Sequence, residues 1–364
     1  MKKKTLPSYI SALIPGLLIS VPALWLAFRN VPFDDLLSYL ASIRYFWLLP
    51  SLCIICISFS FRALRWQIIV RSVHPLSFSG AFHPLMIAFM MNCILPGRAG
   101  ELARPLILKH SHQVPVSAGL ATVAVERVFD LLLLLVFLLT VLAHVDIAAD
   151  LNIRFEGFEL NRDTLGMIER GMRRLCIILI AGIILVTLQK SRKMIQGAVA
   201  AVPSAFFFIS KKSREKLRDK IFLPIADITE SFASGFTLLR SWKKTGACLV
   251  LSAVIWILTA LSYYVFSLGC PGIALSFPEM AAVMILICFF IALPSVPGFW
   301  GIWEAGGVFA MALFAVPRQE AAGFTLANHA IQVFPVIFIG LLSAMYTGVR
   351  ISQISKDKSA NLSG

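Results

Sequence analysis

The sequence predicts an all-helical membrane protein that crosses the bilayer several times. Of its 364 residues, 58% are hydrophobic and only 14% are charged, and the mean hydropathy of +0.83 is too high for a soluble domain. Many of the apolar residues form runs close to the ~20 residues that a helix needs to cross a bilayer. The formal net charge of +14 favours loops that face anionic lipid head groups. Nucleic acid is not an expected partner, because no basic soluble domain is present to bind it.

Six apolar runs are predicted to cross the membrane completely. The first follows a basic "MKKK" start like that of a signal peptide, but it is about 19 residues long and lacks a convincing cleavage site, so we expect an uncleaved span. The shortest run needs help from flanking residues to span. The six runs are residues 10–28, 46–61, 117–143, 175–188, 246–268 and 324–347.

Two further apolar runs, 84–95 and 280–293, stop at prolines. At 1.5 Å per residue each reaches only about 18–21 Å, which is less than the thickness of the hydrocarbon core. We therefore expect each run to enter the membrane and turn back as a re-entrant helical hairpin. The hairpins are predicted near residues 84–109 and 280–316.

The two predicted breaks share a pattern of proline and glycine followed by glutamate. The first reads "PGRAGE" and the second "PGFWGIWE". If the hairpins enter from opposite sides, residues 1–143 and 246–350 form an inverted repeat, which is typical of transporters with a site near the membrane midplane. Two unrelated kinks are the alternative. The residues of the breaks are Pro96, Gly97, Gly100, Pro297, Gly298 and Gly301.

The distribution of lysine and arginine predicts the orientation. Residues 189–245 carry twelve basic residues against four acidic ones, which places them in the cytoplasm. The N-terminal lysines, a loop containing Arg62, Arg65 and Arg71, and the C-terminal tail agree, so both termini are expected to be cytoplasmic in a single membrane domain, 1–364. The uncharged stretch 194–209 is short and contains a proline, so we expect it on the membrane surface rather than as a seventh span.

Three charged residues, Glu126, Arg127 and Asp130, lie deep in the predicted span 117–143. A charged side chain at such a depth costs roughly 2.5–3.5 kcal/mol, so these groups need partners or a wet cavity. We expect them to face Arg98, Glu101 and Arg104 beside the first break.

This charge cluster allows two interpretations. It is either a structural network of ion pairs, or a site in which arginines offer forked donors to a phosphate while carboxylates orient them and exchange protons. Glu304 would be the counterpart of Glu101 at the second break. A polar patch at Asn328, His329 and Gln332 is typical of hydrogen bonding between helices, with a proton relay at His329 as the alternative.

Three segments resemble the lysylphosphatidylglycerol synthase transmembrane family, also called the flippase-like domain family: "NCILPGRAGELAR", "ERVFD" and "PSVPGFWGIWE". The resemblance implies a polytopic domain that moves phospholipids or polyprenyl-linked lipids between leaflets. Members with an aminoacyl transferase domain carry it after the membrane region, and this sequence does not extend into one, so lysyl transfer is not expected. The positions that match the family pattern are Asn92, Pro96, Arg98, Gly100, Glu101, Arg104, Glu126, Arg127, Asp130, Pro297, Gly298, Gly301 and Glu304.

These observations predict an inner-membrane translocator for an anionic phospholipid or a polyprenyl or glycolipid phosphate. No nucleotide-binding loop, metal motif or catalytic nucleophile is recognisable, so no cofactor is expected. The alternatives are a membrane enzyme that acts on a lipid phosphate, and a scaffold for a glycosyltransferase bound through 189–245. Possible partners are a second copy of the chain or such a glycosyltransferase. The predicted head-group ligands are Arg98, Arg104, Arg127 and Asn92, and the predicted charge partners or proton carriers are Glu101, Glu126, Asp130 and Glu304.

Overall fold

The computed structural model describes residues 6–96, 98–144, 153–155, 158–160, 162–187, 238 and 241–349. In these residues the fold is helical apart from one short antiparallel hairpin of two strands. The elements are α1 (Leu6–Phe28), α2 (Phe33–Ser42), η1 (Tyr45–Trp47), α3 (Leu48–Val70), α4 (Phe78–Ile94), α5 (Ala99–His112), α6 (Val116–His144), β1 (Ile153–Phe155), β2 (Phe158–Leu160), α7 (Arg162–Thr187), α11 (Trp242–Ser267), α12 (Phe277–Phe290), η4 (Pro297–Phe299), α13 (Ile302–Ala312) and α14 (Arg318–Thr347).

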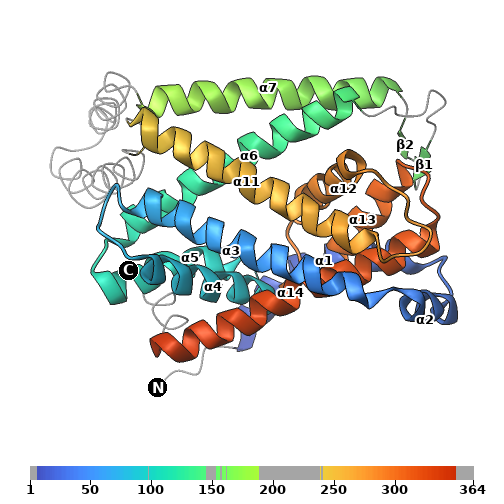
Figure 1. The fold of residues 1–364 in the computed structure, drawn as a ribbon, viewed down its shortest axis with the longest axis horizontal. Helices are drawn as coiled ribbons and strands as arrows, with labels where there is room; N and C mark the ends of the chain where they lie inside the picture. Colours follow the sequence, from blue (N-terminus) through green and yellow to red (C-terminus); the bar gives the residue numbers. More distant parts are fainter. Residues whose placement is uncertain are drawn as a thin grey trace, which may run out of the picture.

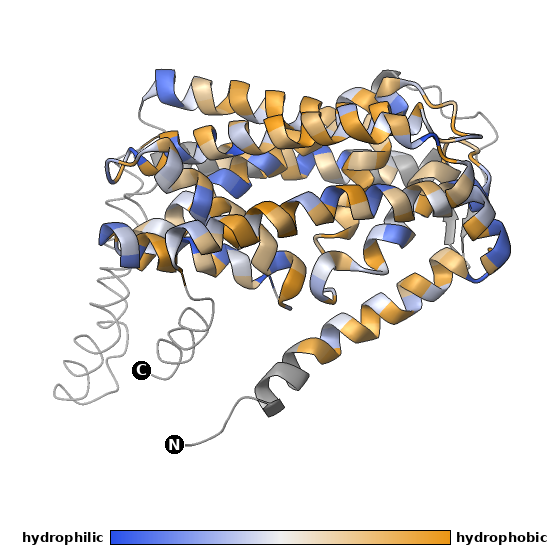
Figure 2. Ribbon diagram, turned by 60° about the horizontal axis from the view of Figure 1, so that its bottom comes forward, coloured by the Kyte–Doolittle hydropathy of each residue, from blue (hydrophilic) through white to orange (hydrophobic). Residues whose placement is uncertain are grey.

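The longest apolar helices make this a multi-pass membrane protein. η1 together with α3, α11 and α14 are each long and apolar enough to cross a bilayer, and α1 with α2 forms a fourth candidate that bends by 77°. α6 and α7 are 29 and 26 residues long, but both carry charged residues in their first halves. The total of six full spans therefore stays a prediction. Figure 2 shows hydrophobic residues along much of the outer helices, as expected of surfaces that face lipid.

Two helix boundaries differ from the prediction. α3 continues to Val70 rather than ending at 61, so Arg62 and Arg65 lie inside a helix and not in a cytoplasmic loop. In the protein interior Arg65 is paired with Glu126 and Asp130, and Arg62 donates to Thr259, so the helix continues through both arginines. α7 begins at Arg162, well before the predicted start at 175. The stretch 194–209 and most of the basic segment 189–245 lie outside the described residues.

At the positions of both predicted hairpins two helices pack against each other, while their re-entry into the membrane stays a prediction. α4 packs against α5, and α12 packs against α13 with η4 in the connection. The first connection turns at Arg98, which has a φ of 52°, and the second turns at Gly298 and Gly301, with φ values of 74° and 86°. Gly97 lies outside the described residues. No membrane accompanies the structure, so the inverted repeat stays a prediction.

The two connections meet in the interior of the molecule. η4 packs against α4, while α14 packs against both α4 and α13, so one long helix supports both hairpins (Figure 1). At Gly100 a Cβ atom would lie 1.8 Å from the carbonyl oxygen of Ala88, so the approach of α5 to α4 requires glycine. At Gly301 a Cβ atom would lie 2.2 Å from the carbonyl oxygen of Ser20 in α1.

α3 and α11 run side by side through the body of the protein, and α6 packs against both (Figure 1). α7 packs on the outer side of α6 along one edge. The apolar core fills the space between the second hairpin, α11 and α14. Its fully buried members include Met280, Met284, Met311, Phe266 and Phe324. This arrangement places the charged turns of α3, α5 and α6 beside the first connection.

Candidate functional site

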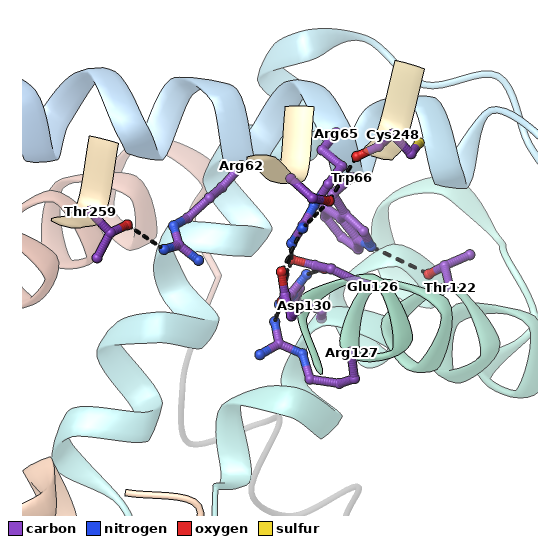
Figure 3. A network of polar contacts seen from close by, with 11 residues as sticks. Arg62, Arg65, Trp66, Thr122, Glu126, Arg127, Asp130, Cys248 and Thr259 are labelled. Atoms are coloured by element: carbon purple, nitrogen blue, oxygen red, sulfur yellow. Dashed lines mark hydrogen bonds and ion pairs between the residues drawn. The ribbon is translucent and has the colours of Figure 1, made fainter. Parts of the chain in front are cut away.

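A buried arginine on α3 is the centre of the charged cluster. The Arg65 guanidinium donates to the Asp130 carboxylate at 2.5 and 3.2 Å and to Oε1 of Glu126 at 2.9 Å. It also donates to Oγ of Ser252 on α11 at 2.7 Å. Figure 3 shows Arg65 directed from α3 towards the two carboxylates of α6. One side chain thus connects three helices.

Arg104 of α5 completes this cluster by donating to the other carboxylate oxygen of Glu126. Arg65, Arg104, Glu126 and Asp130 are all at most 4% exposed, and we call them the buried quartet. Their formal charges cancel. A balanced set of this kind can remain in a low-dielectric interior, whereas the loss of one member leaves an uncompensated charge.

Arg104 therefore faces away from solvent. Its guanidinium carbon lies over the rings of Trp66 at 5.1 Å and Phe89 at 5.5 Å. The Trp66 indole in turn donates to Oγ1 of Thr122 on α6. For Arg104 and the two carboxylates of α6, this geometry matches the ion-pair interpretation of the sequence.

A second layer of arginines lies beside the quartet and reaches open space. Arg127 is 39% exposed and approaches Asp130 at 3.3 Å and Glu126 at 3.4 Å. Arg62 donates to Oγ1 of Thr259 at 3.1 Å and lies over the Trp256 ring at 5.2 Å (Figure 3). Within the described ranges, no carboxylate lies within ion-pair distance of Arg62. These two guanidinium groups are therefore incompletely neutralised.

Arg98 joins the two hairpins. It caps the start of α5, and its guanidinium donates to the carbonyl oxygen of Ile291 at the end of α12 at 2.7 Å. Glu101 lies 3.8 Å away, and both side chains are partly exposed, at 40% and 30%. A bond from a cation to a helix C-terminus is favourable, because the last carbonyl oxygens carry partial negative charge.

A cavity of about 240 Å³ brings three partly exposed arginines together. Arg62, Arg98 and Arg127 line it with a single carboxylate, Glu101, so the lining carries an excess of two positive charges. The remaining wall is largely aromatic and apolar; it includes Phe59, Phe89, Trp256, Tyr263, Phe299 and Trp303. We call this space the charged cavity.

A second cavity of about 250 Å³ lies on the other side of the first connection, between it, α1 and residues 292–296. Asn92, Arg98 and Phe299 line both cavities. The Asn92 side-chain oxygen also accepts the N–H of Gly100 at 2.8 Å, which caps the first turn of α5. Asn92 and Arg98 thus stand at a partition between the two spaces.

Glu304 lies elsewhere, in the interior of the second hairpin. Its carboxylate accepts the Gly301 N–H at 2.7 Å and lies 2.6 Å from Nδ1 of His329. The His329 ring stacks on Trp303 and also contacts Trp300, with both centroids at 4.4 Å. Gln332, the third member of the predicted polar patch, lines the charged cavity and donates to Ser262.

Sequence reasoning missed Arg62 and Arg65 as site residues. In "FRALRWQIIV" the apolar residues resume directly after Arg65. A helix that continues through this stretch would have placed the two arginines on one face, three residues apart. In the part of the chain that the structure describes, no three His, Cys, Asp or Glu side chains are grouped so that they could hold a metal ion.

Comparison with known proteins gives two matches. The family model described as "Lysylphosphatidylglycerol synthase TM region" matches residues 13–340. The chain is also similar to the protein "Glycosyltransferase AglD" of Haloferax volcanii, with 24% identity over 363 residues that cover 93% of this chain and 55% of that protein. This chain thus spans about half the length of that relative. Together the two matches support a role connected with membrane lipids, and the extent of the first shows that this chain belongs to the lysylphosphatidylglycerol synthase transmembrane family.

Proposed function

We propose that this protein moves a lipid with an anionic head group between the two leaflets, and that the head group passes through the charged cavity. The observation that carries the proposal is the excess of two positive charges in a cavity at the junction of two broken helices. A single protein charge at such a depth is costly in an apolar surrounding. A phosphate that neutralises the arginines removes part of that cost.

The proposed ligands are Arg62, Arg98 and Arg127. A guanidinium offers a planar fork of donors that matches phosphate oxygens. Arg98 would exchange its bond to the Ile291 carbonyl for one to the phosphate, which would free the two connections from each other. Arg104 was expected among the ligands, but it does not line the cavity, so we assign it a supporting role in the buried quartet.

The lipid tails also need a path. An apolar groove of about 800 Å³ lies between α2, α3 and α14, and Trp300 of the second connection lines it. Its walls include Leu52, Ile331 and Phe334. We propose that acyl or polyprenyl chains follow this groove while the head group is in the cavity.

The membrane arrangement is part of the proposal. We infer an inner-membrane location with both termini in the cytoplasm, based on the twelve basic residues of 189–245. If the hairpins enter from opposite sides, the partition at Asn92 and Arg98 would close the cavity to one leaflet at a time.

The relative suggests a second candidate function. Its printed name is that of a glycosyltransferase, and the aligned region is about half of that protein. This favours a lipid-linked sugar phosphate as the substrate, or a membrane unit that presents such a lipid to a glycosyltransferase. Mass spectrometry of candidate lipids incubated with purified protein separates both alternatives from an enzyme acting on the lipid, because translocation and presentation leave the lipid covalently unchanged.

The direct test is lipid movement in proteoliposomes. Fluorescent phosphatidylglycerol in the inner leaflet becomes accessible to an impermeant quencher only after translocation. We expect Arg62→Ala, Arg98→Ala and Arg127→Ala each to slow movement roughly tenfold or more, because each removes charge-assisted hydrogen bonds to the phosphate. Arg44→Ala is the matched control, since Arg44 is exposed and does not line the cavity. Unchanged movement in all three variants, at equal protein incorporation, rejects the proposal.

A further inference from the structure

The second hairpin contains an ionisable pair that the proposed lipid path does not use. Glu304 and His329 are both 0% exposed. Nδ1 of His329 lies 2.6 Å from Oε1 of Glu304, and Nε2 lies 2.8 Å from the carbonyl oxygen of Gly298. The other oxygen of Glu304 accepts the N–H of Gly301 at 2.7 Å. Every polar atom of the two side chains thus has a partner.

These contacts determine the number of protons in the pair. A carbonyl oxygen can only accept, so Nε2 of His329 must carry a hydrogen. The short contact between Nδ1 and Oε1 then requires one further proton, carried by either atom. With that proton the pair has no net charge. A second proton would place a hydrogen on both Nδ1 of His329 and Oε1 of Glu304, and the two hydrogens would repel each other. Loss of the shared proton would leave the lone pair of Nδ1 facing the negatively charged carboxylate. Both changes break the contact.

The shared proton therefore holds the connection between α12 and α13 against α14. His329 belongs to α14, whereas Gly298 lies in η4 and Gly301 directly precedes α13. Both glycines have positive φ, at 74° and 86°, so this turn has a conformation of its own that the pair holds in place. The imidazole stacks on the ring of Trp303 and also contacts the ring of Trp300, and an aromatic face is favourable for a protonated imidazole.

No other described ionisable group competes for this proton. On α1, residues 13–28 contain none. Tyr39 of α2 donates to Pro271 instead, and His83 of α4 bonds to Ser343. The described ionisable groups that line the charged cavity together with Trp303 are Arg62, Arg98, Glu101, Arg127, Tyr263 and Cys288, and none of them forms a hydrogen bond or an ion pair with Glu304 or His329.

We infer that Glu304 and His329 form a proton-binding site that locks the second hairpin, and that lipid movement is coupled to release and return of this proton. On release, the proton passes to water and the pair changes from net charge zero to minus one. The bond between α13 and α14 is then lost and the connection can move. The coupling rests on the proposed function, whereas the lock does not.

Glu304→Gln is the informative variant. The introduced amide can donate to Nδ1 of a neutral His329, while its carbonyl oxygen accepts the Gly301 N–H, so both bonds remain without a proton that can dissociate. Hydrogen exchange with mass spectrometry on the full chain reports the lock through peptides covering residues 292–305. Peptides from α11 serve as the internal reference for the intrinsic pH dependence of exchange.

In the wild type we expect protection of residues 292–305 to fall by roughly tenfold to a hundredfold as the pH is raised and the shared proton is released. In Glu304→Gln we expect constant protection. Equal profiles for the two proteins overturn the lock. If the variant does not fold, the wild type alone decides, because protection that does not change with pH also overturns it.

Translocation of fluorescent phosphatidylglycerol over the same pH range separates the lock from its coupling. We expect the wild-type rate to change with pH and the rate of Glu304→Gln to be constant and lower. A pH-dependent lock in a protein that moves no lipid rejects the proposed function and leaves the proton site standing. Lipid movement at the same rate at every pH in both proteins leaves the function standing and overturns the coupling.

Discussion

Replacement of Arg65 by methionine tests the buried quartet directly. The substitution keeps an unbranched side chain of similar length and removes the four hydrogen bonds to Asp130, Glu126 and Ser252. Breaking a buried ion pair by removing one partner typically costs about 3–5 kcal/mol of stability. Here Glu126 keeps Arg104, and Asp130 keeps a contact with Arg127 at 3.3 Å. We therefore expect a loss in the free energy of unfolding near the lower limit, about 3 kcal/mol.

The assay is equilibrium unfolding of the purified protein in mixed micelles, with Arg44→Met as the control for removing an exposed arginine. Asp130→Leu and the double variant complete a thermodynamic cycle. Because the double variant removes one charge of each sign, it should cost less than the sum of the single variants by about 1–3 kcal/mol. If the effects add within about 0.5 kcal/mol, or if Arg65→Met behaves like Arg44→Met, the reasoning about the quartet is wrong.

Three further predictions follow from the same geometry. Gly100→Ala should destabilise the protein by about 1–3 kcal/mol, because its Cβ would lie 1.8 Å from the Ala88 oxygen; Gly246→Ala, with no atom within 4 Å, is the control in the same unfolding assay. Arg104→Ala should lower the free energy of unfolding more than Arg62→Ala does, whereas Arg62→Ala should weaken the binding of phosphatidylglycerol more. Measuring both unfolding and lipid binding for the two variants tests whether Arg104 is structural and Arg62 is a lipid ligand. Ile331→Trp should slow lipid movement by filling the apolar groove without affecting binding of soluble glycerol phosphate to the cavity.

The positions of the hairpins could be predicted because their causes are local. A single proline such as Pro84 or Pro335 lies inside a continuous helix here, but adjacent proline and glycine with a second glycine close by, as in "ILPGRAG" and "SVPGFWG", mark the breaks without knowledge of any neighbour. The apolar runs of α3, α11 and α14 could likewise be recognised from their length, whereas the count of six full spans stays a prediction. The end of α3 was predicted wrongly, since the charge of Arg62 and Arg65 resembles a loop unless their partners are known.

Those partners are distant in the sequence. Arg65 is separated from Glu126 by 61 positions and from Ser252 by 187. No periodicity or spacing links such positions, so the sequence predicted that the charges on α6 need partners but not that Arg65 is one of them. His329 and Glu304 illustrate the same limit, since the 25 positions between them include a turn and most of α13. The paired strands β1 and β2 were likewise not expected.

The buried quartet and the charged cavity depend on each other. Apart from Glu101, the carboxylates of Glu126 and Asp130 are the anions that could neutralise an arginine of the cavity, but Arg65 and Arg104 already bind all four of their oxygen atoms. Arg127 therefore shares carboxylates that are satisfied, and Arg62 has only a hydroxyl partner. Because the quartet is rigidly paired, it cannot move to cancel the positive charge of the lining. An anion that enters the cavity therefore meets a positive potential that no movement of these carboxylates reduces. We expect removal of Arg65 to lower the stability of the fold and also to weaken anion binding, because Asp130 would then be released to pair with Arg127 and Arg62.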